Sequence, residues 1–255
     1  MQTTSRSEPR PATCYPSRVS TLRDGWEESA RDWIAWARKP GFDSYWRFHR
    51  DQFLEIVPPA GRRTIDVGCG EGRLSRDLKA RGHVVVGVDG SQTLVDAARE
   101  ADPSIEVHCA DAAKLPLESA CADLVVAFMS LHDVDDLDGA LAEIARVLEP
   151  KGTLALAVVH PINSAGKFAS DDPNAPFVLE ESYLDRRRYT DRFERDGMRM
   201  TFHSIHRSLD AYSRALERAG FVIEAIREHK SPAGTVRAAG WDRVPLFLHV
   251  RARRG

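Results

Sequence analysis

The sequence has few cysteines, no long apolar run and almost no net charge. It holds 4 cysteines in 255 residues, none of them in a Cys-x-x-Cys pair, so neither a zinc ribbon nor a disulfide framework is indicated. No apolar run approaches the ~20 residues needed to span a bilayer. Residues 1–16 lack the apolar segment of a secretory signal, and we predict a disordered tail over 1–20. These absences favour a cytoplasmic protein with no membrane partner.

The charge balance also excludes a partner class. A formal net charge of -2 gives no sign of a nucleic-acid surface. A hydrophobic content of 42% in 255 residues is that of an ordinary globular protein, which predicts one domain over 21–255. Nothing in the sequence resembles a metal site, and the oligomeric state stays open.

Short apolar runs alternate with helical patterns from residue 64 onward. Strands are predicted over 64–67, 83–88, 105–109, 123–128, 153–159, 221–227 and 246–250. The early runs are almost wholly apolar, as expected for strands buried on both faces of a parallel sheet. Repeated strand–helix–strand units predict an α/β fold, with a doubly wound, mostly parallel, seven-stranded, Rossmann-like sheet.

Two segments flank this core. Residues 21–60 are dense in aromatics and predict two amphipathic helices broken at Pro40-Gly41. These helices either pack on the main body or form a cap over a ligand, with Tyr45, Trp46 or His49 facing it.

Residues 160–207 are predicted to be an insertion that acts as a lid over substrate. It contains a hairpin about Asp196-Gly197, which favours a type I′ turn, and this register places Asp191 opposite Phe202. Eight basic and eight acidic side chains leave the insertion without a charge bias. Arg186-Arg187-Arg188 is therefore interpreted as a solvated surface in preference to a phosphate clamp.

A glycine-rich loop follows the first strand, in Asp66-Val67-Gly68-Cys69-Gly70-Glu71-Gly72. Such a turn from strand to helix needs residues without Cβ atoms, and the carboxyl ends of the strands are where open α/β sheets bind ligands. Asp89 ends the second strand and can accept hydrogen bonds from two ribose hydroxyls. These features fit a nicotinamide dinucleotide or another adenosine ligand.

Two details argue against the dinucleotide. The Gly-x-Gly-x-x-Gly fingerprint would need glycine at position 73, where Arg73 stands. Asp66 and Glu71 also place acids where a pyrophosphate would bind, and these suit a ligand with a sulfonium and an α-amino group.

Five motifs carry a resemblance to a known family. They are 65–72, Val86-Gly87-Val88-Asp89-Gly90-Ser91, Ala110-Asp111-Ala112 with Leu115-Pro116-Leu117, Asp123-Leu124-Val125-Val126, and Leu148-Glu149-Pro150-Lys151-Gly152. In this order and spacing the sequence resembles the class I S-adenosylmethionine-dependent methyltransferases, in the small-molecule branch with the ubiquinone/menaquinone methyltransferase-like enzymes.

The resemblance implies S-adenosyl-L-methionine as cofactor and a set of residues that bind it. The set is Asp66, Gly68, Cys69, Gly70, Asp89, Gly90, Ser91, Asp111, Ala112, Phe128 and Met129. Within it, Asp89 would take the ribose hydroxyls and Asp111 the adenine amino group. Either aspartate could instead be a helix cap or turn residue.

The implied reaction is methyl transfer to an O, N or C nucleophile of a small molecule. Such a nucleophile can need a base, and histidine titrates in the useful range. His160, His132 and His206 are the catalytic candidates, and His203 is a weaker one. Each could instead order a loop or pack in the core. A non-catalytic S-adenosylmethionine-binding regulator or assembly protein is the alternative function, and a nicotinamide oxidoreductase is a third.

Overall fold

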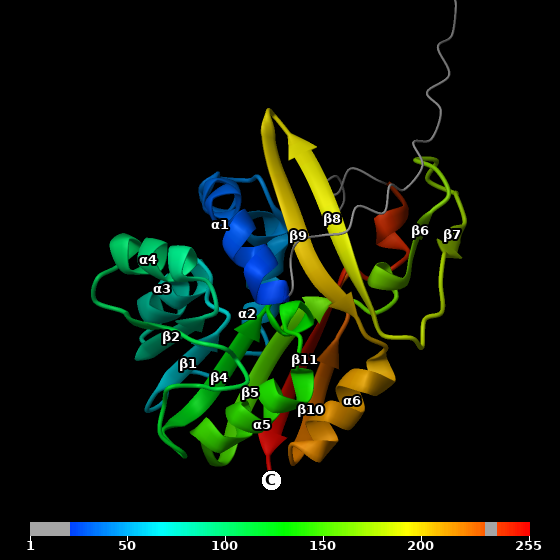
Figure 1. Cartoon of the computed structure of the whole chain (residues 1–255). Helices are drawn as coiled ribbons and strands as arrows, with labels where there is room; N and C mark the ends of the chain where they lie inside the picture. Colours follow the sequence, from blue (N-terminus) through cyan, green and yellow to red (C-terminus); the bar gives the residue numbers. More distant parts are fainter. Residues whose placement is uncertain (1–20, 233–238) are drawn as a thin grey trace, which may run out of the picture.

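A computed structural model describes residues 21–232 and 239–255. Its main sheet has seven strands in the order β10-β11-β5-β4-β1-β2-β3 (Figure 1). The strands are β1 (Thr64–Val67), β2 (Val85–Asp89), β3 (Glu106–Cys109), β4 (Ala122–Phe128), β5 (Leu148–Val159), β10 (Phe221–Arg227) and β11 (Phe247–Arg254). Strand β11 runs antiparallel to both of its neighbours, while the pairs among β1 to β5 are parallel. The predicted doubly wound sheet is confirmed.

Helices cover both faces of the sheet because alternate strand residues point to opposite sides. Val125 and Ala127 of β4 pack with α5 (Leu137–Val147) and α6 (Leu209–Arg218). Leu124 and Val126 pack on the other side with α2 (Arg50–Leu54) and α3 (Arg73–Ala80). Helix α4 (Gln92–Ala101) lies beside β2 and β3 and shares a smaller cluster with Val107. The wholly apolar strands are therefore buried on both faces of the sheet.

The N-terminal segment forms the two predicted helices. Helix α1 (Leu22–Arg38) begins with a capping box between Thr21 and Asp24, which satisfies two of its first backbone N–H groups. A π-helical turn (Tyr45–His49) leads into α2. In Figure 1, α1 lies between the β8–β9 hairpin and α4, and it contacts both. It therefore covers the carboxyl ends of the central strands.

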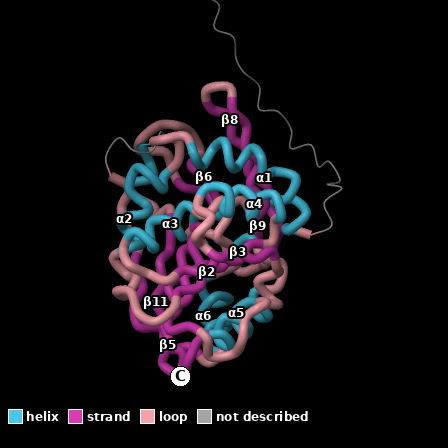
Figure 2. The backbone as a smooth tube through the Cα atoms, turned by 90° about the vertical axis from the view of Figure 1, so that its left-hand side faces the viewer, coloured by secondary structure: helices cyan, strands magenta, loops and turns pink. Residues whose placement is uncertain are grey.

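The insertion after β5 forms two hairpins. The larger one joins β8 (Arg187–Arg195) to β9 (Met198–His206), and Asp196 and Gly197 have φ of 48° and 77°, as a type I′ turn requires. Asp191 pairs with Phe202, as predicted. The tip projects away from the sheet in both views (Figures 1 and 2). A second hairpin of β6 (Gly166–Phe168) and β7 (Phe177–Leu179) was not predicted.

Some strand boundaries differ from the prediction. Strand β5 starts at Leu148 instead of Thr153, because Leu148 already pairs with Ala122 before a register shift. Strand β2 starts at Val85, since His83 turns its ring toward Thr64 for a hydrogen bond of 2.9 Å between Nδ1 and Oγ1. Short 3₁₀ turns occupy Leu131–Asp133, Asn163–Ala165 and Ala239–Asp242.

Two other predictions concern the ends of the chain and membranes. The predicted disordered tail at 1–20 lies outside the described residues. Within 21–232 and 239–255, no helix combines the length and apolar character needed to cross a bilayer.

Candidate functional site

One large cavity opens at the carboxyl ends of β1, β2 and β4. The strand order reverses between β1 and β4, which is where a doubly wound sheet leaves a crevice for ligands. The cavity has a volume of about 1120 Å³, more than the ~300–1,000 Å³ of a site for one drug-sized ligand. All eleven residues predicted to bind cofactor line it, from Asp66 to Met129. Its size leaves room for a second molecule beside a cofactor.

The glycine loop forms the floor of this cavity. Gly68 and Gly70 have φ of 74° and 58°, a region that strongly favours glycine. A Cβ at Gly68 would collide with the Cβ of Ser130 at the end of β4. The Gly68 N–H donates to Val88 O at 2.7 Å and the Gly70 N–H to Asp89 Oδ2 at 2.8 Å. The loop is therefore a bare backbone surface tied to the end of β2.

Asp89 fits the ribose of a nucleoside. Its Oδ2 accepts from Gly70 N and its Oδ1 from Ser91 N at 2.9 Å, so both oxygens are held in place and still have lone pairs. Burial raises the pKa of this carboxyl, although the two backbone hydrogen bonds oppose the shift. Vicinal hydroxyls would supply the donors that a buried carboxylate lacks. A carboxylate held in this way fits the ribose of an adenosine ligand.

Asp66 is the second carboxyl at the cavity floor. It is buried and accepts a hydrogen bond of 2.6 Å from Ser75 Oγ. Burial raises its pKa to about 7, while the bond from Ser75 opposes the shift. An ammonium group beside Asp66 would compensate its buried charge. The position therefore suits the amino group of a methionine-type ligand.

Glu71 does not contribute as the sequence suggested. Its carboxylate is buried and binds the guanidinium groups of Arg38, at 3.0 Å, and Arg76, at 2.9 Å. The acid that the sequence places in the loop is thus neutralised by the protein itself. The interpretation of Glu71 as a group that attracts a cationic ligand is corrected.

The adenine end of the cavity is formed by the turns after β2 and β3. Ser91 caps α4 and also donates to Glu27 Oε2 of α1 at 2.5 Å. Asp111 Oδ1 accepts from Ala113 N at 2.8 Å, so one oxygen orders its turn and Oδ2 is left for a ligand. The Cys69 side chain packs in the core beside Val107, so Cys69 lines the cavity mainly with its backbone.

The end of β4 bounds the cavity next to the glycine loop. Met129 has a φ of 55° and its N–H donates to Ala157 O at 2.8 Å. A non-glycine residue in the left-handed region is uncommon and clusters at functional sites. Phe128 packs against the rings of His49 and Phe53, at centroid distances of 4.6 and 4.9 Å.

The structure separates the three catalytic candidates. His132 lines the cavity, is 5% exposed, and its Nδ1 has no hydrogen-bond partner among the described residues. Burial, with a smaller contribution from Arg207, lowers the pKa of His132 to about 3. It is therefore a neutral imidazole with one nitrogen available to a ligand.

His160 and His206 do not line the cavity. His160 Nε2 lies 2.7 Å from Glu228 Oε1, and its Nδ1 accepts from Ile162 N at 3.0 Å. Both nitrogens of His206 are also engaged, with Ser164 Oγ at 2.7 Å and Tyr183 O at 2.9 Å. These two histidines order the insertion, which corrects their placement at the site.

His203, the weaker catalytic candidate, lies between helix α1 and the β8–β9 hairpin. His203 points from the hairpin toward α1, where its Nε2 lies 3.4 Å from Ser29 Oγ.

The N-terminal segment lines part of the cavity, mostly with residues other than the three that the sequence favoured. Of the three candidates only His49 lines it; Tyr45 is buried, with its hydroxyl donating to Asp77 at 2.7 Å, and the Trp46 indole N–H donates to Ala37 O at 2.9 Å. Three tryptophans of this segment line the cavity instead: Trp26, Trp33 and Trp36. Their spacing indicated an amphipathic helix but not which face of it meets a ligand.

Arg73 joins the cap to the loop. Its guanidinium binds Asp43 at 2.6 Å and lies over the rings of Trp33, at 4.8 Å, and Tyr45, at 4.2 Å. The residue that replaces a Rossmann glycine is thus used to hold the helical cap in place.

Further cavity residues come from the turn after β4 and from the lid hairpin. Asp133, Tyr189, Asp191 and Ser204 all line it, and Ser204 Oγ donates to Asp133 Oδ1 at 2.6 Å. Burial raises the pKa of Asp133 well above its usual value. The alternation of the hairpin was the available signal, because it places Tyr189 and Asp191 on one face.

The doubly wound sheet carries a bare glycine loop and a buried carboxylate at the end of its second strand, an arrangement compatible with binding of a nucleoside cofactor. The family model described as a methyltransferase domain matches residues 65–156. An uncharacterized methyltransferase of Mycobacterium tuberculosis is 38% identical over 101 residues, which are 40% of this chain and 41% of the relative. The chain thus aligns with about two fifths of that relative's length.

Two other proteins extend the likeness. Demethylmenaquinone methyltransferase of Clavibacter sepedonicus is 31% identical over 144 residues, covering 55% of this chain and 58% of the relative. The crystal structure of an S-adenosylmethionine-dependent methyltransferase from Mesorhizobium loti has a TM-score of 0.66 and 28% identity, over 83% of this chain and 98% of that one. The matching domain, these relatives and this structure are all described as methyltransferases, and the likeness extends over residues 65–156 for the family model and over 83% of the chain for the fold.

Proposed function

We propose that the protein transfers the methyl group of S-adenosylmethionine to a nucleophile of a small molecule. The observation that carries the proposal is one cavity of about 1120 Å³, in which we distinguish two compartments by their lining residues. One is formed by the glycine loop with Asp66, Asp89 and Asp111. The other is enclosed by α1, the lid hairpin and the end of β4. A cytoplasmic location and the absence of nucleic-acid and membrane partners stay predictions.

The chain's own residues would act by positioning. Asp89 would hold the ribose, Asp66 the amino group of the methionine part, and the backbone of Gly68 and Gly70 would let the cofactor approach closely. The bound cofactor supplies an electrophilic methyl group, and the protein aligns the nucleophile with it and excludes water.

His132 is the retained candidate for contact with the substrate. Its Nδ1 is buried at the cavity wall without a partner in the described chain, and a substrate O–H or N–H would satisfy it. With a pKa of about 3 it is a weak base, so we expect it to orient the nucleophile by a hydrogen bond.

Isothermal titration tests the proposal. S-adenosylhomocysteine should bind the purified chain with a dissociation constant in the micromolar range. Asp89→Asn should weaken this binding at least ten-fold. An amide has only one acceptor oxygen, so it cannot accept hydrogen bonds from both ribose hydroxyls. Gln92→Asn, on the outer side of the same turn, is the control. No binding by the wild type would end the proposal, and binding without turnover on any acceptor would favour the regulatory alternative.

A further inference from the structure

The lid hairpin presents one carboxylate to the cavity without a counter-charge. Asp191 of β8 lies directly opposite Phe202 of β9 and lines the cavity. Across residues 21–232 and 239–255 it has no hydrogen-bond or ion-pair partner. Its side chain is exposed to solvent where the hairpin borders the cavity. Its carboxylate is therefore accessible to a ligand that carries a positive charge.

A cluster of aromatic rings lies beside this carboxylate. The Phe202 ring lies 6.1 Å from Trp26, 5.9 Å from Trp33 and 5.6 Å from Phe193, each in an edge arrangement. All four rings line the same cavity. Directly opposed residues of an antiparallel pair have Cβ atoms about 4.5–5.5 Å apart, so Asp191 lies at the border of this ring cluster. Ring faces and a carboxylate together favour a cation.

The cationic side chains of the cavity already bind other groups of the protein. The cationic side chains that line it are Arg23, Arg73, Lys167, Arg187 and Arg188. Arg23 donates to Gly90 O at 2.7 Å. The others bind Asp43, Glu180, Glu181 and Asp135, at 2.6, 2.6, 3.1 and 2.5 Å respectively. At Arg73, Lys167, Arg187 and Arg188 an anionic substrate would therefore have to compete with an existing ion pair.

We propose that the substrate carries a protonated amine, which Asp191 binds as a counter-ion against the rings of Trp26, Trp33, Phe193 and Phe202. This inference rests on the proposed function, and it specifies the substrate class for the same cavity. Asp191 acts here in binding and specificity. The methylated atom can be the amine itself or another atom of the same molecule.

The test compares three probes of one shape and different charge. The protein is first saturated with S-adenosylhomocysteine. It is then titrated with 2-phenylethylamine, 2-phenylethanol and 3-phenylpropanoate up to 10 mM, and tryptophan fluorescence is followed. The amine should saturate and bind at least ten-fold more tightly than the alcohol or the acid. Equal or tighter binding of the acid or alcohol, or no saturation by the amine, overturns the proposal.

Two variants locate the effect. Asp191→Asn should remove the preference for the amine, whereas Glu194→Gln should keep it. Glu194 lies on the same strand but pairs outward with Arg199 at 3.1 Å, so it controls for the loss of one hairpin carboxylate. Asp191→Glu should restore part of the preference if the carboxylate itself is required. A preference that persists in Asp191→Asn would refute the assignment.

The cofactor distinguishes this inference from the proposed function. S-adenosylhomocysteine should bind Asp191→Asn with an affinity within two-fold of the wild type. A ten-fold loss would place Asp191 at the ammonium group of the cofactor and overturn the inference while leaving the proposed function in place. Failure of the wild type to bind S-adenosylhomocysteine would instead end the proposed function.

Discussion

At the scale of single residues, the site consists of carboxyl groups whose charge the fold disfavours. Burial raises the pKa of Asp66, Asp89 and Asp133. Each raised pKa means that the folded protein opposes ionisation, and a cationic or hydroxyl-bearing ligand would relieve this penalty. The site is thus arranged for a ligand that brings positive charge and donors to it.

Asp66 gives a direct test through proton release. With a pKa of about 7, its carboxyl is about half protonated at pH 7, and an ammonium group beside it should lower that pKa. Binding of S-adenosylhomocysteine at pH 7 should therefore release up to about half a proton per site. Titration calorimetry in buffers of different ionisation enthalpy measures this number.

Adenosine is the matched control for this measurement, because it lacks the methionine part and should release less. Asp66→Asn should abolish the difference between the two ligands. Equal proton release by adenosine and S-adenosylhomocysteine in the wild type would contradict the assignment of Asp66.

Gly68 tests the bare backbone of the loop. Gly68→Ala places a Cβ against Ser130 in a backbone with φ of 74°. We expect a loss of about 2–4 kcal/mol in the free energy of unfolding, from the left-handed conformation and the overlap together. Urea denaturation measures the loss, and calorimetry should show weakened cofactor binding.

Gly197→Ala separates the two causes. Gly197 has a φ of 77° and open space where a Cβ would lie. This variant should lose only about 1–2 kcal/mol and bind S-adenosylhomocysteine as the wild type does. If both variants lost the same stability, the contact with Ser130 would carry no weight.

At the scale of elements, the sequence predicted the sheet and the lid hairpin well. Period-two alternation and the Asp196-Gly197 turn are local signals, so the pairing of Asp191 with Phe202 followed from them. The early start of β5 was missed because pairing with Ala122 overrode the turn residues after Leu148. The orientation of α1 was also missed, since it depends on contacts with segments far away in the sequence.

Glu27 is the contact that fixes α1 over the cofactor compartment. Its carboxylate accepts from Ser91 Oγ and from Thr93 Oγ1, both at 2.5 Å. Glu27→Gln replaces two charge-assisted hydrogen bonds by weaker ones, at about 0.5–1.5 kcal/mol each. We expect faster amide hydrogen exchange along α1 and a roughly three- to ten-fold weaker affinity for S-adenosylhomocysteine.

Glu28→Gln is the control for this prediction, because Glu28 is the exposed neighbour on the same helix. Exchange along α1 in this variant should match the wild type. Equal exchange in Glu27→Gln and the wild type would show that other contacts hold the helix.

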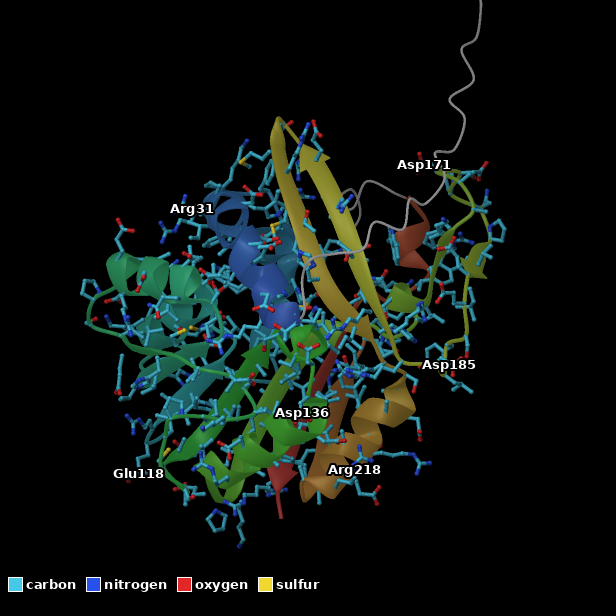
Figure 3. The ribbon with its side chains drawn as sticks, viewed as in Figure 1. Arg31, Glu118, Asp136, Asp171, Asp185 and Arg218 are labelled. Atoms are coloured by element: carbon cyan, nitrogen blue, oxygen red, sulfur yellow. The ribbon has the colours of Figure 1, made fainter. Side chains whose placement is uncertain are left out.

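At the scale of the whole molecule, the site exists only where distant segments meet. Figure 3 places Asp136 at the start of α5; it lines the cavity together with Trp26 of α1 and Phe202 of β9. The motifs of the family specify the cofactor compartment, because they follow the strand ends in order. The substrate compartment arises from the packing of the cap on the insertion, which no single motif encodes.

Two buried histidines join the N-terminal segment to strand β11 of the sheet. His49 Nε2 lies 2.9 Å from His249 Nε2, and both side chains are almost fully buried. Burial is the main cause that lowers the pKa of both, in His249 to about 3. A hydrogen bond between two imidazoles needs one donor and one acceptor, so the pair is stable when neutral.

This pair predicts how stability depends on pH. In the unfolded chain each histidine takes up a proton below a pKa of about 6.5, whereas in the folded protein His249 does so only near 3. The unfolded state therefore binds more protons between these values. The contribution of the buried histidines to the free energy of unfolding is fully present above pH 6.5 and is lost as the pH is lowered. The slope is up to about 1.4 kcal/mol per pH unit for each such histidine. His249→Gln should reduce the loss between pH 6.5 and 4.5 by about 1 kcal/mol per pH unit, measured by urea denaturation. An unchanged slope in His249→Gln would show that other groups cause the acid sensitivity.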